Sequence, residues 1–240
     1  MLSIVTPTLN AAAFLPTCLA EVARLGFPHE HIVVDGGSLD DTVAIARDAG
    51  ATVLRQERAN GMYGAINDGL RASRGSYLTY VNADDAPVPG GYAALYERID
   101  APDAPTLVYG DCVYRNETPG QVASERLVRA RTAGAYFLRR GLLPFAQPSA
   151  LFRREAFEAA GGFDAETYRI AGDLEFFRRM ALRPGFRAAR VPGAAAVFLK
   201  HGASLGDQNT PLAEAERRRM GVGTRPGPVD RLLFRLASWA

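Results

Sequence analysis

Two adjacent carboxylates, Asp84 and Asp85, follow directly on residues 77–81, an apolar, β-branched and aromatic run that predicts a buried strand. In open α/β folds, ligands bind at the carboxyl ends of the strands. Two like charges this close repel each other unless a cation or a set of hydrogen-bond donors lies between them. A hard divalent ion, held by one or two carboxylates and by substrate phosphates, is the usual arrangement. Asp84 and Asp85 are therefore candidate metal ligands, and a turn that caps the next helix is the alternative.

Four further polar segments stand where predicted strands end or predicted helices begin. They are Thr6-Pro7-Thr8-Leu9-Asn10, Asp35-Gly36-Gly37-Ser38, Asn60-Gly61-Met62-Tyr63-Gly64-Ala65-Ile66-Asn67 and Ala171-Gly172-Asp173-Leu174-Glu175. Glycines at strand ends let a ligand approach the backbone, and carboxylates there accept hydrogen bonds from ribose hydroxyls or a base N–H. The five segments together predict a nucleotide site with a metal beneath the phosphates.

Single residues in these segments also have plainer interpretations. Asp173 is equally suited to capping a helix, and Asp35 is equally suited to a turn. Asn67 would then satisfy a backbone group, and Tyr63 would be a core residue.

The elements that must position these residues alternate between strand and helix in the first half of the chain. The hydrophobic patterns predict strands over residues 2–6, 31–34, 52–54 and 77–82, and helices over residues 11–25, 40–49 and 62–72. Repeated units of this size predict a parallel sheet with helices on both faces and right-handed crossovers. A dinucleotide cofactor is not expected, because no glycine fingerprint follows the first strand.

The second half of the chain is less regular. Strands are predicted over residues 107–113, 148–152 and 194–200, and helices over residues 154–160 and 170–182, whereas the basic segment 121–140 has no assignment. The tail from Glu214 onward is arginine-rich and then apolar. It is expected either to lie on an anionic membrane surface or to pack as a helix on the domain or on a second subunit.

Composition narrows the class of protein. The 240 residues are 48% hydrophobic and 22% charged, which is ordinary for a globular chain of one large or two small domains. A formal net charge of +2 is too small for a nucleic-acid-binding protein. Cys18 and Cys112 stand far apart in apolar contexts, which predicts buried thiols in a reducing compartment. No signal-peptide pattern or apolar run of bilayer length is found, so a cytoplasmic location is expected.

In order and spacing, five segments of the chain resemble the family 2 glycosyltransferases of the GT-A fold, the inverting group that builds bacterial polysaccharides. The segments are residues 3–10, 31–42, 61–69, 80–85 and 161–173. The resemblance spans residues 1–205 and implies an α/β fold of the GT-A type. That fold has a Rossmann-like, mostly parallel central sheet flanked by helices. A nucleotide-sugar-binding half would cover residues 1–112, and a less regular half with the acceptor site and catalytic base residues 113–205. Residues 206–240 would form the tail.

The resemblance also implies a role for each matched position. Asp173 is the implied general base, and Asp85 is the favoured metal ligand, with Asp84 nearer the ribose or phosphate. His201 is a further candidate beside the metal or the diphosphate, and a surface turn is its alternative. Gln147 and Glu175 are expected on the acceptor side. The implied donor contacts are Thr6, Pro7, Asn10, Asp35, Gly36, Asn60, Asn67, Asn82 and Asp84.

The implied reaction moves a sugar from a nucleotide-diphosphate sugar to a hydroxyl of a saccharide or lipid-linked acceptor, with inversion, in cell-surface polysaccharide synthesis. Mg2+ or Mn2+ would neutralise charge on the leaving diphosphate, and a carboxylate would take the proton of the attacking hydroxyl. The chain departs from many relatives, which carry Asp where it has Gly36, Gly64, Asn82 and either Ala59 or Asn60. These departures imply a changed donor preference or a weakened activity.

Two other functions fit parts of the pattern. A nucleotidyltransferase also uses a Rossmann-like sheet, a metal and carboxylates, but residues 6–14 contain no glycine, lysine or arginine to hold a triphosphate. A non-catalytic module that binds nucleotide sugars or glycans would not need Asp173. No nucleic-acid partner is expected, whereas contact of the tail with the inner membrane face and a homo-oligomer are both left open.

Overall fold

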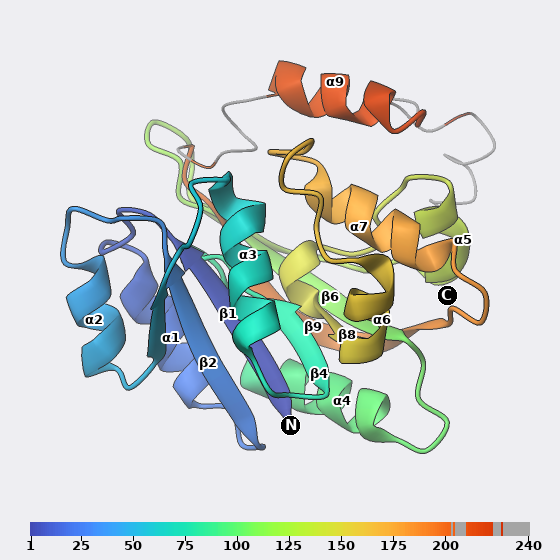
Figure 1. The fold of residues 1–240 in the computed structure, drawn as a ribbon, viewed down its shortest axis with the longest axis horizontal. Helices are drawn as coiled ribbons and strands as arrows, with labels where there is room; N and C mark the ends of the chain where they lie inside the picture. The colour runs from blue at the N-terminus through green and yellow to red at the C-terminus, as the bar shows by residue number, and fades with distance from the viewer. Residues whose placement is uncertain (203, 205–209, 223–226, 228–240) are drawn as a thin grey trace.

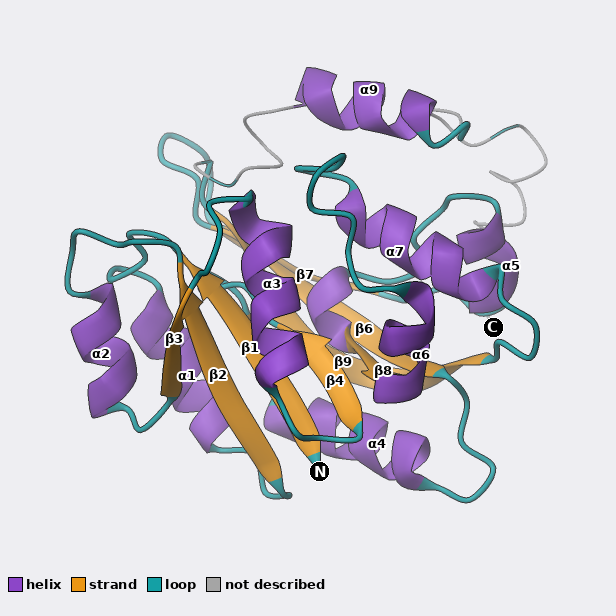
Figure 2. Ribbon diagram, viewed as in Figure 1, coloured by secondary structure: helices purple, strands orange, loops and turns teal. Residues whose placement is uncertain are grey.

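The computed structural model describes residues 1–202, 204, 210–222 and 227, and it builds them around one mixed sheet with helices on both faces (Figure 1, Figure 2). The sheet order is β3-β2-β1-β4-β8-β6-β9-β5, and β7 pairs with β6. The predicted fold class is therefore confirmed. The strands are β1 (Leu2–Thr8), β2 (His29–Asp35), β3 (Thr52–Arg55), β4 (Tyr77–Tyr80), β5 (Ala86–Pro87), β6 (Leu107–Asn116), β7 (Ser124–Val128), β8 (Ala150–Arg153) and β9 (Ala188–Lys200).

Helices α1, α2 and α3 agree with the predicted units, and the helices of the second half follow less regular connections. They are α1 (Leu15–Ala23), α2 (Thr42–Asp48), α3 (Gly61–Ala72), α4 (Pro89–Asp100), α5 (Gly134–Arg139), α6 (Arg154–Ala160), α7 (Gly172–Ala181) and α9 (Thr210–Arg219), with a 3-10 turn at Gln147–Ser149. Within these ranges, no helix is long and apolar enough to cross a bilayer.

The parallel part of the sheet brings the predicted site segments to one edge. β1 pairs in parallel with both β2 and β4, and β2 pairs in parallel with β3, so their carboxyl ends point the same way. The same edge receives the first residues of α3 and α7, and α9 crosses above it (Figure 1). Strand-end residues that are far apart in the sequence therefore share one face of the molecule.

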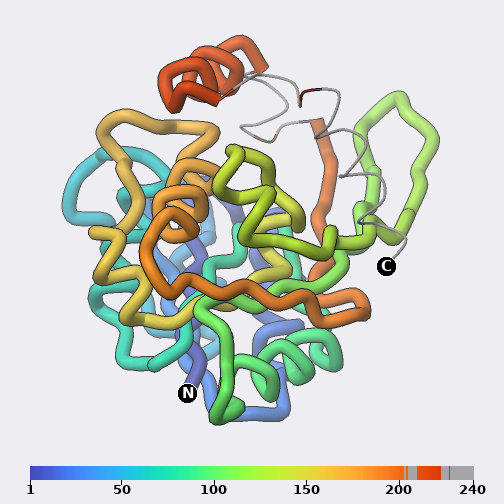
Figure 3. The backbone as a smooth tube through the Cα atoms, turned by 90° about the vertical axis from the view of Figure 1, so that its right-hand side faces the viewer, coloured from blue at the N-terminus to red at the C-terminus, as the bar shows by residue number. Residues whose placement is uncertain are grey.

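The second half completes the sheet with strands of mixed direction. β8 runs antiparallel between β4 and β6, and β9 runs parallel to β6 with two shifts of register near Gly110. The β6–β7 hairpin, in green, projects from the body of the molecule beside the end of β9 (Figure 3). Because its strands run in mixed directions, the second half does not show the regular strand–helix alternation of the first half.

Three apolar clusters hold the helices on the sheet, and one of them packs α1 and α2 around Leu15 and Ala46. On one face, α3, α6 and α7 bury an aromatic cluster in which the rings of Phe163 and Phe176 stack 4.1 Å apart. On the other face, α1 and α4 bury residues that include Cys18 and Tyr92. Cys18 and Cys112 are both buried free thiols, as predicted.

Several elements were not predicted, and each has a local reason. α4 contains Gly90 and Gly91, which weaken a helical signal. β7 is a short strand on the hairpin with four exposed residues, so it lacks an apolar alternation. The strand predicted over residues 148–152 begins only at Ala150, because the segment with Pro148 forms the 3-10 turn.

Candidate active site

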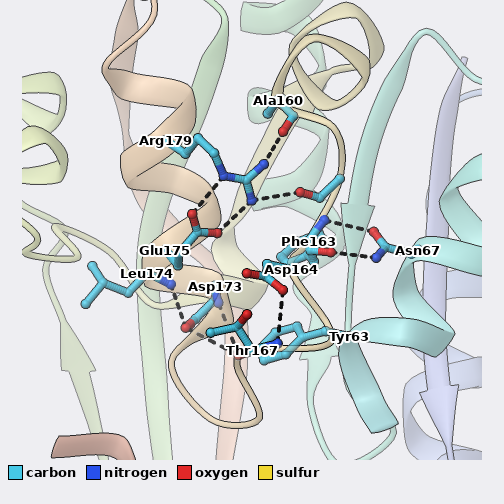
Figure 4. A network of polar contacts seen from close by, with 11 residues as sticks. Tyr63, Asn67, Ala160, Phe163, Asp164, Thr167, Asp173, Leu174, Glu175 and Arg179 are labelled. Carbon is cyan, nitrogen blue, oxygen red and sulfur yellow. Dashed lines mark hydrogen bonds and ion pairs between the residues drawn. The ribbon is translucent and has the colours of Figure 1, made fainter. Parts of the chain in front are cut away.

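Asp173 lies in the first turn of α7 and is held by a tyrosine from α3. The hydroxyl of Tyr63 donates to the carbonyl of Ile170 at 2.8 Å and accepts the backbone N–H of Asp173 at 3.1 Å (Figure 4). It also lies 3.5 Å from Oδ1 of Asp173, while the N–H of Leu174 donates to that oxygen at 2.7 Å. The donor half of the chain therefore reaches across to orient the predicted base.

The environment of Asp173 suits a proton acceptor. Burial raises the pKa of its carboxyl from 3.8 to about 6, against the opposing effects of the Leu174 N–H, the Tyr63 hydroxyl and the positive charge of Arg217. A carboxyl with this pKa is ionised at neutral pH and is a stronger base than an ordinary aspartate.

The ring of Tyr63 lies against Gly172, where there is no space for a side chain. A Cβ on Gly172 would lie 2.5 Å from Cε2 of Tyr63, so any other residue at the start of α7 would displace the ring. The ring is fully buried and stacks on Phe163 with centroids 5.5 Å apart. Tyr63 is thus a core residue, as its plainer interpretation held, and its hydroxyl is also part of the site. Sequence reasoning missed this second part.

The acidic pair after β4 divides into a buried and an accessible carboxylate. Asp85 is buried, with Oδ1 accepting the N–H of Leu199 at 3.2 Å and Oδ2 accepting from the Asn82 amide at 3.3 Å. Burial, followed by the negative charge of Asp84, raises the pKa of Asp85 well above its ordinary value. The side chain of Asp84 is 23% exposed and is therefore the better placed of the two to meet a ligand.

His201 joins Asp84 from the end of β9. Its Nε2 lies 2.9 Å from Oδ2 of Asp84, and its ring packs against Phe14 at a centroid distance of 4.4 Å. In the described part of the chain, no three or more His, Cys, Asp or Glu residues form a group that could enclose an ion. An ion at this place would therefore take further ligands from a bound phosphate or from water.

Two buried oxygens beside the acidic pair have no hydrogen-bond partner. They are Oδ1 of Asn82 and Oε1 of Gln147, whose Nε2 donates to the carbonyl of Tyr80 at 2.7 Å. Buried acceptors of this kind are costly unless a ligand or water satisfies them. The Asp84 carboxylate, the His201 imidazole and the unpartnered amide oxygen of Asn82 are ligand types that a hard divalent cation accepts, with further ligands from a bound phosphate or water.

The predicted donor edge is built from linked turns after β1 and β2. The carboxylate of Asp35 accepts the N–H groups of Gly37 and Ser38 at 2.9 and 3.0 Å, so turn formation is its observed role. Asn10 accepts the N–H of Leu39 at 2.8 Å and donates its own N–H to Ser38 at 2.8 Å. These contacts fix the two strand-end loops relative to each other.

Gly36 and Pro7 lie within this edge. The N–H of Gly36 donates to the carbonyl of Thr8 at 2.8 Å, and a Cβ on Gly36 would lie 3.3 Å from that oxygen. Pro7 is a buried residue of β1 that pairs with Val34.

Three of the residues predicted for the site make contacts within the protein instead, and they are Thr6, Asn67 and Glu175. Thr6 is fully buried and contacts Nε2 of His31 at 2.9 Å, so it does not reach the strand end that Thr8 occupies. This corrects the nucleoside contact implied for Thr6. Asn67 likewise uses both ends of its amide on the backbone of Phe163, at 2.8 and 2.9 Å, which corrects its expected donor contact.

Glu175 is also committed within the protein. Its carboxylate forms two hydrogen bonds to Arg179, at 2.6 and 2.7 Å (Figure 4). Arg179 in turn donates to the carbonyls of Ala160 and Gly162, so the pair ties α7 to the end of α6. The observed role of Glu175 is structural, and its expected place on the acceptor side stays a prediction.

Two departures from the family pattern belong to one local arrangement. Oδ1 of Asn60 accepts from Gln56 at 2.8 Å, and a Cβ on Gly64 would lie only 1.5 Å from that oxygen. The side chain at position 60 therefore occupies the space that any side chain at position 64 would need.

Comparisons with known proteins agree with this geometry. The sequence model of the family described as Glycosyl transferase family 2 matches residues 3–161. A protein of Mycobacterium bovis (strain BCG / Pasteur 1173P2) named PGL/p-HBAD biosynthesis glycosyltransferase is 29% identical over 95% of this chain and 86% of its own. Glycosyltransferase GlyG of Streptococcus pneumoniae serotype 4 is 29% identical over 50% of this chain and 42% of its own.

Two solved structures share the fold. S. aureus TarS 1-349 in complex with UDP-GlcNAc has a TM-score of 0.65 at 15% identity, over 97% of this chain and 70% of that chain. The mannosyltransferase PcManGT from Pyrobaculum calidifontis, in complex with GDP-Man and Mn2+, has a TM-score of 0.64 at 22% identity, over 98% and 68%. The chain therefore belongs to glycosyltransferase family 2 and has the GT-A fold.

Proposed function

We propose that the chain is an inverting glycosyltransferase that moves a sugar from a nucleotide-diphosphate sugar to a hydroxyl of a saccharide or lipid-linked acceptor. One observation carries the proposal: Asp85 of the acidic pair and the proposed base Asp173 both act on the same buried phenol, Tyr80. Burial raises the pKa of Tyr80 well above its ordinary value, and the negative charges of Asp173 and Asp85 add to the effect. Asp173 and Asp85, 88 positions apart in sequence, are thus both close enough to Tyr80 to influence it.

The proton transfer would belong to Asp173. Its carboxylate accepts the proton of the attacking hydroxyl, and the hydroxyl of Tyr63 keeps the start of α7 in place while it does so. A single displacement needs one base and no protein nucleophile, which is why we assign inversion. The buried setting keeps the base poised near neutral pH.

The cation would lie beside Asp84 and His201. Both side chains are more accessible than Asp85, whose oxygens already accept from Leu199 and Asn82. We therefore favour Asp84 over Asp85 as the direct ligand of Mg2+ or Mn2+. When bound, such an ion neutralises charge on the leaving diphosphate. The Mn2+ in the structure of the Pyrobaculum calidifontis mannosyltransferase supports the use of a divalent cation by this fold.

The donor and acceptor classes rest on the relatives and on the strand-end loops. TarS and the mannosyltransferase were solved with UDP-GlcNAc and GDP-Man, which supports a nucleotide sugar on the edge formed by Asn10, Asp35 and Gly36. The mycobacterial relatives are named as glycosyltransferases of PGL/p-HBAD biosynthesis, which supports glycosyl transfer to an acceptor in a biosynthetic sequence.

The test is a donor screen followed by one substitution. The protein is incubated with UDP-, GDP- and dTDP-sugars, Mn2+ and a panel of saccharide acceptors, and release of nucleoside diphosphate is measured. Asp173→Asn should lower turnover by about 10²–10⁴-fold, the usual contribution of a general base. The same variant should bind the nucleoside diphosphate as tightly as the wild type. Equal turnover by the variant and the wild type would refute the assignment of the base.

A further inference from the structure

A buried glutamate on α9 holds the segment that carries the proposed base. The side chain of Glu216 is 3% exposed and accepts three backbone N–H groups. Oε1 accepts from Arg169 at 2.7 Å, and Oε2 accepts from Ile170 at 3.0 Å and from Ala171 at 2.7 Å. Charge-assisted bonds of this length are the stronger class of hydrogen bond in proteins.

The three N–H groups belong to the turn that leads into α7. Backbone N–H groups in such a turn have no regular helix or strand partner, so an acceptor from elsewhere must satisfy them when they are buried. No side-chain cap is formed at Ala171, the N-cap of α7. Glu216 supplies the acceptors from a helix that begins almost 40 residues later in the chain.

The same turn is held at two other points. The hydroxyl of Tyr63 donates to the carbonyl of Ile170, and the guanidinium of Arg169 donates to the carbonyl of Asn60 at 2.6 Å. Tyr63 and Asn60 both come from the start of α3. The turn is therefore fixed to α3 on one side and to α9 on the other, with Asp173 directly after it.

Glu216 differs from Glu214, the other glutamate of α9, in its burial and in its partners. Glu214 has a half-exposed side chain, and its carboxylate forms an ion pair with Arg218, at 3.8 Å, on the same helix. The neighbouring Arg217 donates to the carbonyl of Gly141 at 3.1 Å, which ties α9 to the end of α5 as well. α9 thus spans α5 and the start of α7, beyond the residues 3–161 that the family model matches.

We propose that Glu216 is a positioning residue for glycosyl transfer, which fixes the backbone of residues 169–171 so that Asp173 faces the incoming hydroxyl. α9 is then a working part of the active site and not an appendage to it. This inference rests on the proposed role of Asp173 as the base. A base displaced by about 1 Å loses on the order of 10²-fold in rate, so a loss of the three bonds should be visible in turnover.

The experiment compares Glu216→Ala and Glu216→Gln with Glu214→Gln as the matched control. Glu216→Ala should lower kcat by about 10–100-fold while the donor KM stays within about twofold, because the donor edge is untouched. Glu216→Gln keeps one acceptor oxygen and should give an intermediate kcat. Glu214→Gln should behave as the wild type. Hydrogen exchange should show faster exchange of the amides of residues 169–171 in Glu216→Ala alone.

Two results would overturn the inference. One is a Glu216→Ala variant with wild-type kcat and wild-type exchange at residues 169–171. The other is a loss that appears wholly in the donor KM. If the alanine variant does not fold, the near-isosteric Glu216→Gln decides by the same readouts. Asp173→Asn is assayed beside them, because full turnover by that variant refutes the proposed base, whereas failure of the present inference appears only in the Glu216 variants.

Discussion

At the scale of the residue, the chemistry depends on one carboxyl that must be ionised to act. Burial holds the pKa of Asp173 at about 6, so the unprotonated fraction falls tenfold for each pH unit well below that value. We expect kcat/KM to fall with the same slope below about pH 6. A pH profile measured with a saturating acceptor checks this, and a flat profile between pH 5 and 8 would contradict it.

Arg217 offers a way to move that profile. Its positive charge opposes the rise in the pKa of Asp173, so Arg217→Gln should shift the acid limb of kcat/KM to higher pH. The size of the shift is read directly from the profile. Arg218→Gln, on the exposed side of the same helix, is the control and should leave the limb where it is.

The metal ligands can also be separated residue by residue. Asp84→Asn should weaken the Mn2+-dependent binding of nucleoside diphosphate by more than about tenfold. The neutral amide is a poorer ligand for a hard divalent cation than the carboxylate that it replaces. Thr6→Val should leave that binding unchanged, since Thr6 is fully buried and contacts His31. Calorimetry with and without Mn2+ measures both. A larger loss of this binding in Thr6→Val than in Asp84→Asn would refute the assignment of Asp84 as a metal ligand.

At the scale of the element, the predicted and observed positions agree for residues that stand at the end of a strand or at the start of a helix. The acidic pair after β4, Asp35 at the end of β2 and Asp173 at the start of α7 all lie close to where the strand and helix patterns place them. Thr6 was misplaced because β1 continues two residues further than predicted, to Thr8. The pairing of Glu175 with Arg179 was visible in their spacing of four residues within a helix.

Other contacts leave no local pattern. Glu216 accepts N–H groups 45 to 47 positions earlier in the chain, and backbone donors carry no side-chain identity that a sequence could show. The two bonds between Asn67 and Phe163 span 96 positions and have the same character. These links arise only when the sheet has brought α3, α7 and α9 together.

The start of α3 gives a prediction at this scale. A Cβ on Gly64 would overlap the side chain of Asn60, so Gly64→Ala should lower the free energy of unfolding by about 1–3 kcal/mol, the usual cost of overpacking. Asn60→Ala should relieve most of that cost in the double variant, because the two residues compete for one space. Urea unfolding of the four proteins measures the coupling, and strictly additive losses would contradict it.

At the scale of the whole molecule, the proposed active site joins three separated parts of the chain. α3 supplies Tyr63, α7 supplies Asp173 and α9 supplies Glu216, so catalysis should depend on how the two halves and the tail are held together. α9 is the packed helix that one interpretation of the tail anticipated. The apolar residues that suggested membrane contact, from Leu232 to Trp239, lie outside the described residues.

The cost of keeping a buried base should appear in the stability of the entire fold. Asp173 has a pKa of about 6 in the folded protein and 3.8 as its ordinary value, so the folded state binds the proton more tightly. Stability from this residue is present below pH 3.8 and is lost as pH rises through about 6, by up to about 3 kcal/mol. Asp173→Asn, which cannot ionise, should therefore be more stable than the wild type at pH 8 and should keep only about half of that advantage at pH 5.

Thermal unfolding at the two pH values measures the difference. For a chain of this size, about 1–3 kcal/mol corresponds to a rise in Tm of several degrees at pH 8. Glu214→Gln removes a carboxylate from an exposed position and should show no such change with pH. A variant that gains stability while it loses turnover would show that burial of Asp173 is maintained for catalysis at the expense of the fold. Equal stability of Asp173→Asn and the wild type at both pH values would instead mean that Asp173 is not the desolvated carboxyl on which the proposed chemistry depends.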